Sequence, residues 1–179
     1  MSQQMGKSGE VTLMPVGIVR NEIKEPLLKV GSDDIELQEK FAQAKKKIHE
    51  IREKESEVII EKELEGILEG IEDFSHVMVL YWAHQIPSES RSLTKIHPMG
   101  RKELPLMGIF ATCSPARPNP VLTTVVQLVE RKGNILIVKG LDAVDGSPVI
   151  DIKPFAPGFY PSEEVKTSEW MEQIQREFS

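Results

Sequence analysis

Short β-prone runs separated by turn residues recur through most of this sequence, and they limit the folds open to it. Runs of strand length cover residues 13–20, 58–60, 76–82, 107–112, 121–130, 135–138 and 149–152. Arg131-Lys-Gly-Asn134 predicts a hairpin between two of them, because Gly and Asn tolerate positive φ, and Asp145-Gly146 predicts another tight turn. The strand–helix alternation of a doubly wound sheet is absent. We therefore predict a mainly β protein, an antiparallel sheet curled into a small barrel.

Two segments break this pattern and predict helices. Apolar residues follow a 4-3-4-3 spacing at Leu37, Phe41, Ala44, Ile48 and Ile51, which predicts an inserted amphipathic helix from about Asp33 to about Glu55, with Ser32 as its N-cap. Trp170, Ile174 and Phe178 predict a C-terminal helix over about 167–178 that packs on the barrel or on a partner. No repeat or low-complexity linker divides the chain. We expect one domain over 1–179 with its core in 13–158.

Composition excludes several classes of protein. The 22 Lys and Arg against 28 Asp and Glu give a formal charge of −6, which argues against non-specific coating of nucleic acid. One cysteine and four histidines without ligand spacing predict neither a disulfide nor a metal site. The apolar fraction, 40%, is too low for a membrane protein, and the first ten residues are polar and small. We expect a cytoplasmic protein that does not enter membranes.

The segment Gly108 to Pro120 has the most unusual composition, with three prolines among polar residues between two predicted strands. Proline removes backbone freedom, so such a loop loses little entropy on binding, and Arg117 and Asn119 could clamp a ligand there. The alternative is a plain crossover loop whose prolines prevent edge pairing. Cys113 in this loop is expected to be a small buried thiol.

Two other residue pairs were candidates for chemistry. In a strand, neighbours point to opposite faces, so Ser75 and His76 are not expected to form a nucleophile–base pair, and His76 is expected to be a hydrogen-bonded structural residue. Asp151 and Lys153 share one strand face and could pair with each other.

Six motifs together resemble one family. They are Pro15-Val-Gly-Ile-Val-Arg20, Glu72-Asp-Phe-Ser-His76, His84-Gln85, Gly108-Ile-Phe-Ala-Thr112, Ser114-Pro-Ala-Arg-Pro-Asn-Pro120 and Asp145-Gly-Ser-Pro-Val-Ile-Asp-Ile-Lys-Pro154. In this order they resemble the TsaA/YaeB (TrmO) family over most of residues 13–158. The resemblance implies a homodimeric antiparallel β-barrel that binds S-adenosylmethionine. It also implies N6-methylation of threonylcarbamoyladenosine next to the anticodon of threonine tRNA.

The resemblance also implies site residues. Cofactor contacts are expected at Asn21, Glu22, Ile23, His84, Gln85, Cys113, Thr123, Asp145, Gly146, Ser147 and Pro148. A weak urea-like nucleophile needs a proton acceptor, for which we expect Asp145 or Asp151, with His76 behind them. Arg117, Asn119 and Lys153 are expected to hold the loop and the substrate.

Two departures from the family pattern keep other functions open. Most members have an arginine at the position of Cys113 and Ile-Gly-Leu-Ser or similar in place of Val121-Leu-Thr-Thr124. A thiol cannot replace a guanidinium fork. The alternatives are a methyltransferase of the same fold acting on another RNA, a small molecule or a protein, and a non-catalytic barrel that senses S-adenosylmethionine or RNA.

Overall fold

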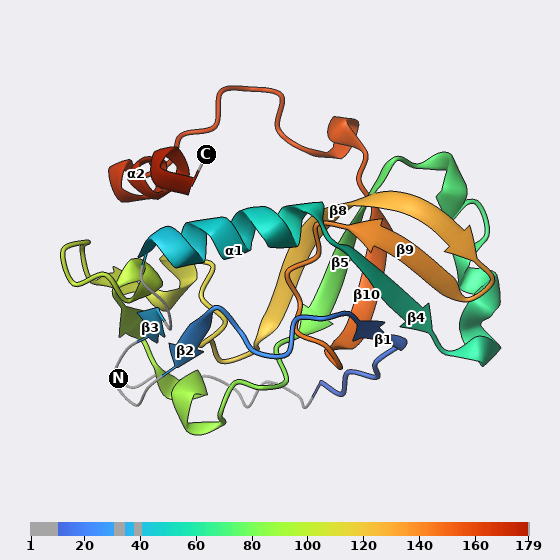
Figure 1. Cartoon of the computed structure of the whole chain (residues 1–179), viewed down its shortest axis with the longest axis horizontal. Helices are drawn as coiled ribbons and strands as arrows, with labels where there is room; N and C mark the ends of the chain where they lie inside the picture. The colour runs from blue at the N-terminus through green and yellow to red at the C-terminus, as the bar shows by residue number, and fades with distance from the viewer. Residues whose placement is uncertain (1–10, 31–34, 38–40, 179) are drawn as a thin grey trace, which may run out of the picture.

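A computed structural model describes residues 11–30, 35–37 and 41–178, and its centre is a closed antiparallel barrel (Figure 1). The strands follow one another around the barrel in the order β1, β10, β5, β8, β9, β4 and back to β1. Their bounds are β1 Gly17–Arg20, β4 Glu55–Ile60, β5 His76–Trp82, β8 Val121–Lys132, β9 Ile135–Lys139 and β10 Pro148–Pro154. The predicted antiparallel barrel is confirmed.

β-branched side chains that alternate along these strands fill the barrel. Val58, Val77, Val79, Val126 and Val138 are at most 1% exposed, and burying each such side chain stabilises the fold by about 1.5–3 kcal/mol. The prediction that strand 76–82 is covered on both faces is wrong. Only alternate residues of β5 are buried, while those between them are half-buried or, at His76, exposed on the outer face.

Two turns lie where the sequence predicted them. Gly133, with φ 63°, lies in the connection between β8 and β9, so the predicted hairpin at 131–134 is confirmed, with both strands slightly longer than expected. Gly146 has φ 79° in the predicted turn before β10. A bulge between Leu128 and Glu130 bends β8 as it follows β9.

Smaller elements form a lobe beside the barrel (Figure 1). Two short sheets consist of β2 (Leu28–Val30) with β3 (Ile35–Leu37), and of β6 (Lys95–Ile96) with β7 (Met107–Gly108). The expected strand over 107–112 is therefore too long, because residues 109–111 form a 3₁₀ turn. The 3₁₀ helices are η1 Lys62–Leu68, η2 Ile71–Asp73, η3 Glu89–Ser92, η4 Pro98–Gly100, η5 Ile109–Ala111 and η6 Pro157–Phe159.

The inserted helix α1 spans Phe41–Glu53 and leads into β4 (Figure 1). Its predicted start at Asp33 is wrong, since residues 35–37 pair with β2 as a strand. The expected cap at Ser32 lies outside the described residues. An apolar residue every third or fourth position cannot distinguish a helix from a short strand that precedes it.

The predicted C-terminal helix is present as α2, Glu169–Phe178. An extended segment carries it away from β10 and places it near the lobe (Figure 1). Its Glu177 pairs with Arg101, and Trp170 lines a pocket together with Leu104 and Pro105. In the part of the chain that the structure describes, no helix is long and apolar enough to cross a bilayer.

Candidate functional site

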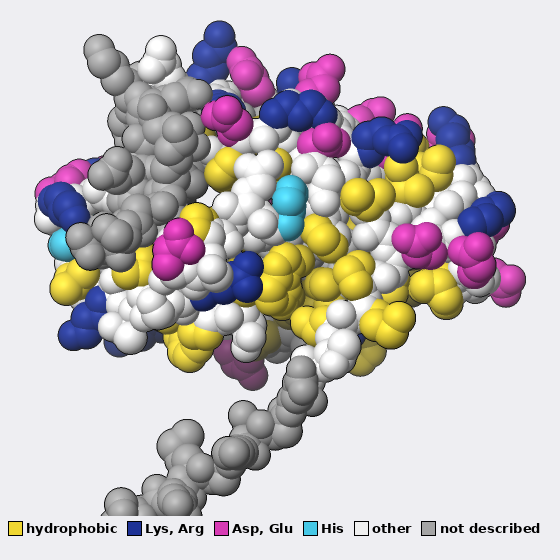
Figure 2. All heavy atoms as spheres, turned by 90° about the horizontal axis from the view of Figure 1, so that it is seen from below, with side chains coloured by type: hydrophobic (Ala, Val, Ile, Leu, Met, Phe, Trp, Pro, Cys, Tyr) yellow, Lys and Arg dark blue, Asp and Glu magenta, His cyan; other side chains and the backbone are white. Residues whose placement is uncertain are grey.

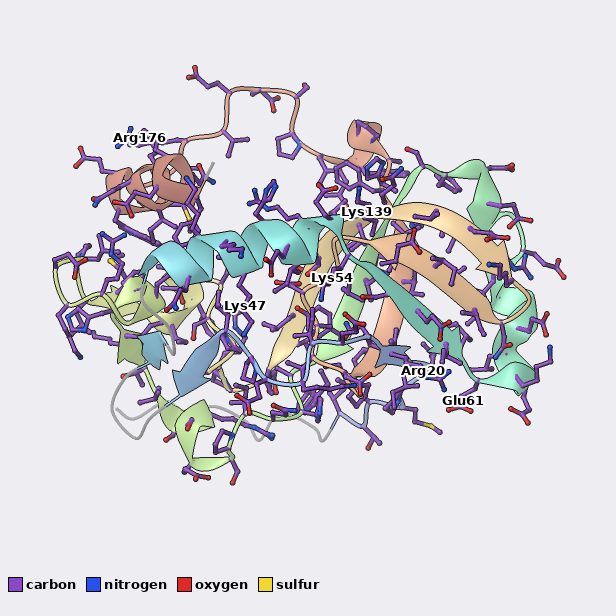
Figure 3. All side chains as sticks on the ribbon, viewed as in Figure 1. Arg20, Lys47, Lys54, Glu61, Lys139 and Arg176 are labelled. Carbon is purple, nitrogen blue, oxygen red and sulfur yellow. The ribbon has the colours of Figure 1, made fainter. Side chains whose placement is uncertain are left out.

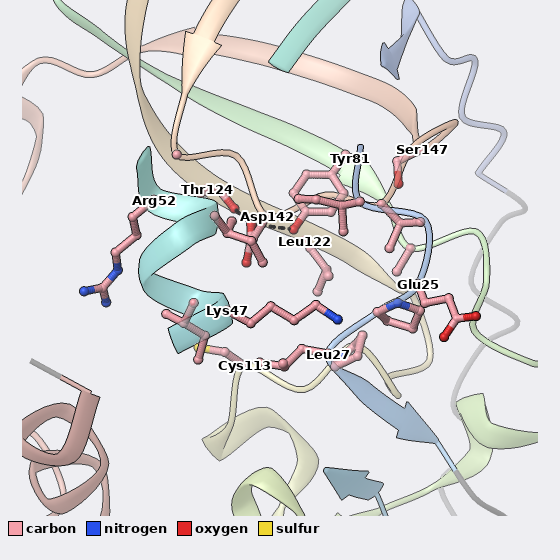
Figure 4. A pocket seen from close by; sticks show the side chains of 18 of the residues that line it. Glu25, Leu27, Lys47, Arg52, Tyr81, Cys113, Leu122, Thr124, Asp142 and Ser147 are labelled. Carbon is pink, nitrogen blue, oxygen red and sulfur yellow. Dashed lines mark hydrogen bonds between the residues drawn. The ribbon is translucent and has the colours of Figure 1, made fainter. Parts of the chain in front are cut away.

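A cavity of about 690 Å³ opens between α1, one mouth of the barrel and four loops (Figure 4). This volume lies within the usual range for small-molecule sites, about 300–1,000 Å³. Its walls come from the segment after β1, from α1, from β5 and the loop after it, from the proline loop, from β8, and from the loop between β9 and β10. Ile23, His84, Gln85, Cys113 and Ser147, which the sequence predicted as cofactor contacts, all line it.

Asn21 joins two of these segments, after β1 and between β9 and β10, to the strand β4 behind them. Its amide nitrogen donates to Ser56 Oγ (3.1 Å) and to the Ala143 carbonyl (2.9 Å), while its Oδ1 accepts from the Ile23 amide (2.9 Å). The Asp145 amide in turn donates to the Ile23 carbonyl (2.7 Å). Asn21 is therefore a positioning residue behind the wall, and it is not among the residues that line the cavity.

The turn at Asp145 closes this wall at the surface. Asp145 Oδ1 accepts from the Asn21 amide (2.9 Å), and Oδ2 accepts from Lys24 Nζ (2.7 Å). The Lys24 hydrogen bond, followed by the Asn21 amide, lowers the pKa of Asp145 below its ordinary value. After the turn, Ser147 Oγ lies 3.3 Å from His84 Nδ1, and both side chains reach the cavity.

The barrel mouth contributes polar residues that the sequence reasoning missed. Tyr81 from β5 and Thr124 from β8 both donate hydrogen bonds to Asp142 Oδ1, the first over 3.0 Å (Figure 4). Tyr81 is paired with Leu122 in the ladder, and both, with Thr124, line the cavity. The alternation of β8 carried the signal, because Thr124 shares its face with the core residue Val126.

Helix α1 forms the remaining side and adds charge. Lys47 extends from α1 across the cavity, and Ile48 and Ile51 give this side its apolar part (Figure 4). At the C-terminal end of α1, Lys54 Nζ bonds Glu22 (2.9 Å) and Lys139 Nζ bonds Glu53 (2.7 Å) (Figure 3). Glu22, a predicted cofactor contact, thus pairs with a lysine and does not line the cavity.

The proline loop is held by its own arginine. Arg117 donates to the carbonyls of Ser114 (2.9 Å) and Thr112 (2.6 Å), so its guanidinium stiffens the loop. The expectation that Cys113 is buried is wrong: the thiol is exposed and lines the cavity. Thr112 and Ser114 instead turn inward and bond the backbone of the loop, which leaves the side chain between them outside. Asn119 is exposed.

The three expected proton acceptors fall in different places. His76, exposed at the start of β5, lines the cavity, but Asp145 and Asp151 are not among its lining residues. Asp151 pairs with Lys153 over 2.6 Å, as predicted, on the face opposite Ile152, which packs on the core. Thr123, Gly146 and Pro148 also do not line the cavity.

One geometric prediction at this site is wrong. His76 Nδ1 lies 2.9 Å from Ser75 Oγ, although neighbouring strand residues were expected to point apart. Strand β5 begins at His76, so Ser75 lies in a bend where the two-residue alternation does not apply.

Residues 34–159 match the profile of the tRNA-methyltransferase O N-terminal domain. The chain belongs to this family. A probable S-adenosyl-L-methionine-binding protein of Methanothermobacter thermautotrophicus is 40% identical over 146 residues, which cover 82% of this chain and 90% of that protein. An S-adenosyl-L-methionine-binding protein of Archaeoglobus fulgidus is 37% identical over 81% of this chain and 89% of its own length.

Solved structures of tRNA-methyltransferase O share the fold. The crystal structure of TrmO from Pseudomonas aeruginosa superposes with a TM-score of 0.64 at 22% identity, covering 92% of this chain. This chain spans 63% of the length of that TrmO chain. The likeness confirms the barrel architecture of the tRNA-methyltransferase O family for this protein.

Proposed function

We propose that this chain is an S-adenosylmethionine-dependent methyltransferase whose methyl donor occupies the cavity between α1 and the barrel mouth. The observation that carries the proposal is the convergence of Ile23, His84, Gln85, Cys113 and Ser147 on one cavity, although they come from distant parts of the sequence. The family profile and the names of the relatives in two archaea point to the same ligand.

The residues of the cavity fit this donor chemically. The donor combines an adenine, a ribose with two hydroxyls, a positively charged sulfonium and an amino-acid end. Its site therefore needs apolar surface together with a few polar groups. Ile23, Ile86, Leu122 and Val144 supply apolar surface, and His84, Gln85 and Ser147 supply hydrogen-bonding groups. When bound, the donor supplies an electrophilic methyl group on its sulfonium.

The chain's own residues would then orient the reactants and exclude water. Displacement at a methyl carbon depends on alignment, which rigid walls provide. The wall fixed by Asn21 and the loop fixed by Arg117 meet this requirement. Among the expected acceptors, His76 has the best position to hold the proton of a nitrogen nucleophile, since it alone of the three lines the cavity.

For the substrate we propose N6 of threonylcarbamoyladenosine in threonine tRNA, bound by a homodimer. The family profile supports a tRNA substrate. Lys and Arg side chains are interspersed with Asp and Glu on the face shown in Figure 2, so binding would depend on local contacts more than on a broad positive field. Arg117, Asn119 and Lys153 stay as proposed contacts of the loop and the substrate.

Mass spectrometry of tRNA nucleosides tests the substrate. The purified protein should add one methyl group to threonylcarbamoyladenosine in tRNA from a strain that lacks the gene, when S-adenosylmethionine is present. Methylation of a different nucleoside would support the same chemistry on another RNA. Tight donor binding without transfer to any RNA would favour the second candidate, a non-catalytic barrel. The two archaeal relatives, which are named only as binding proteins, also support this candidate.

A further inference from the structure

Asp142 differs from the other carboxylates around the cavity in how it is held. Its Oδ1 accepts hydrogen bonds from two hydroxyls, Tyr81 OH and Thr124 Oγ1. These donors come from adjacent strands of the barrel, β5 and β8, and every residue of β5 is paired with a residue of β8. The carboxylate therefore has a fixed orientation at the barrel mouth, where it lines the cavity (Figure 4).

Tyr81 donates its phenol proton to Asp142 in this arrangement. Its side chain is 3% exposed, and burial together with the charge of Asp142 raises the pKa of the phenol. The phenol stays protonated at neutral pH, and its proton is directed at Asp142. Both groups that hold Asp142 are thus neutral, and neither cancels its charge.

The two acids that follow Asp142 in the sequence each form an ion pair with a lysine. Asp145 is paired with Lys24, and Asp151 is paired with Lys153. Within residues 11–30, 35–37 and 41–178, no ion pair is found for Asp142. An ionised carboxylate offers about four acceptor positions, so the two hydroxyls on Oδ1 leave Oδ2 with acceptor capacity.

We propose that Asp142 anchors a nitrogen-borne hydrogen-bond donor of the ligand bound in the cavity. The inference rests on the proposed function for the identity of that ligand. Two nitrogens have the required chemistry, the ammonium of the methyl donor's amino-acid end and the N–H of the methyl acceptor. A charge-assisted hydrogen bond to a fixed carboxylate suits either one. Tyr81 and Thr124 are positioning residues that act through Asp142.

The test uses Asp142→Asn, which keeps the size of the side chain and removes its charge, with Glu130→Gln as the matched control. Glu130 lies on β8 away from the cavity and pairs with Lys132. Two quantities are measured for each variant: the Kd for S-adenosylmethionine by isothermal titration, and kcat and KM for transfer to tRNA. We expect Asp142→Asn to lose about 10- to 100-fold in one of them and Glu130→Gln to match the wild type.

The two readouts identify the nitrogen. A weaker Kd for the donor means that Asp142 holds its ammonium. An unchanged Kd with a lower kcat means that Asp142 holds the N–H of the acceptor. If Asp142→Asn stays within twofold of the wild type in both, while the wild type binds the donor, the inference is overturned and the proposed function stands. If the wild type does not bind the donor, both fail together.

A second pair of variants keeps the test decisive if Asp142→Asn does not fold. Thr124→Ser retains the hydroxyl that bonds Asp142, and Thr124→Val removes it at nearly the same volume. We expect Thr124→Ser to rescue the quantity that Thr124→Val loses. Equal values for the two variants would overturn the role of this hydroxyl and of the carboxylate it orients.

Discussion

At the scale of single residues, the cavity depends on side chains that do not enter it. Asn21 illustrates this, since its amide joins the ends of β1, β4 and the 143–147 turn through three hydrogen bonds. A buried polar group left without its partner costs about 1–3 kcal/mol. The wall that Ile23 and Ser147 form is thus fixed from behind.

Asn21→Ala should therefore lower the free energy of unfolding by about 1–3 kcal/mol and weaken donor binding, because Ile23 loses its support. Urea denaturation and isothermal titration measure the two effects. Asn119→Ala, at an exposed position, is the matched control and should stay within about 0.5 kcal/mol of the wild type. Equal stability of the two variants would contradict the role given to Asn21.

The pair Lys24–Asp145 makes a prediction about pH. The pKa of Asp145 is lowered in the folded protein, so the stabilisation is present above the unfolded carboxyl pKa, about 3.9, and is lost as the pH falls through the folded value. Lys24→Met should be less stable than the wild type at pH 7. The difference should shrink as the pH falls below about 4 and should vanish below the folded pKa of Asp145. Urea denaturation at a series of pH values measures this. A difference that grows toward acid pH would contradict the assignment.

At the scale of elements, β1 can join β4 only because residue 17 has no side chain. A Cβ added at Gly17 would lie 2.2 Å from the Ile59 carbonyl oxygen, a backbone atom that cannot rotate away. Gly17→Ala should destabilise the barrel by about 1–3 kcal/mol or more. Gly108→Ala, where no atom lies within 4 Å of the added Cβ, is the control. Thermal unfolding of both variants decides the point, and a wild-type midpoint for Gly17→Ala would refute it.

An ion pair joins helix α2 to the rest of the chain. Arg101 bonds Glu177 and lowers its pKa, and the segment 160–168 before the helix is exposed. Glu177→Gln should speed proteolysis within 160–168 severalfold, with barrel stability unchanged. Glu164→Gln, in the exposed segment itself, is the control. Unchanged cleavage of Glu177→Gln, measured by mass spectrometry of the fragments, would show that the ion pair does not hold α2.

Local signals in the sequence predicted some elements correctly, whereas features that depend on long-range contacts were missed. The β-branched run of β8 and the Gly-Asn connection to β9 are local signals, and both are confirmed. The start of α1 was not predictable, because Leu37 fits a helical stripe but lies in a strand that pairs with β2. Cys113 was expected to be buried because its chemistry is apolar, whereas its exposure depends on the inward hydrogen bonds of its neighbours. Asp142 was missed, since only the folded chain brings it to Tyr81.

At the scale of the whole molecule, the barrel supplies rigidity and the inserted helix closes the site. The strands hold Tyr81, Leu122 and Thr124 at one mouth, and α1 covers that mouth with Lys47 and its apolar face (Figure 4). Neither part encloses the cavity alone. The sequence resemblance located most of one wall, and the fold added the barrel mouth and α1.

The reactivity of Cys113 tests this account most directly. Cys113 is the single cysteine of the chain, is exposed and lines the cavity. Alkylation by iodoacetamide should slow about 100-fold when S-adenosylmethionine is present at about 100 times its Kd, because the fraction of sites left free is 1/(1 + [L]/Kd). An unchanged alkylation rate, with donor binding verified by titration in the same sample, would place the donor elsewhere and contradict the account.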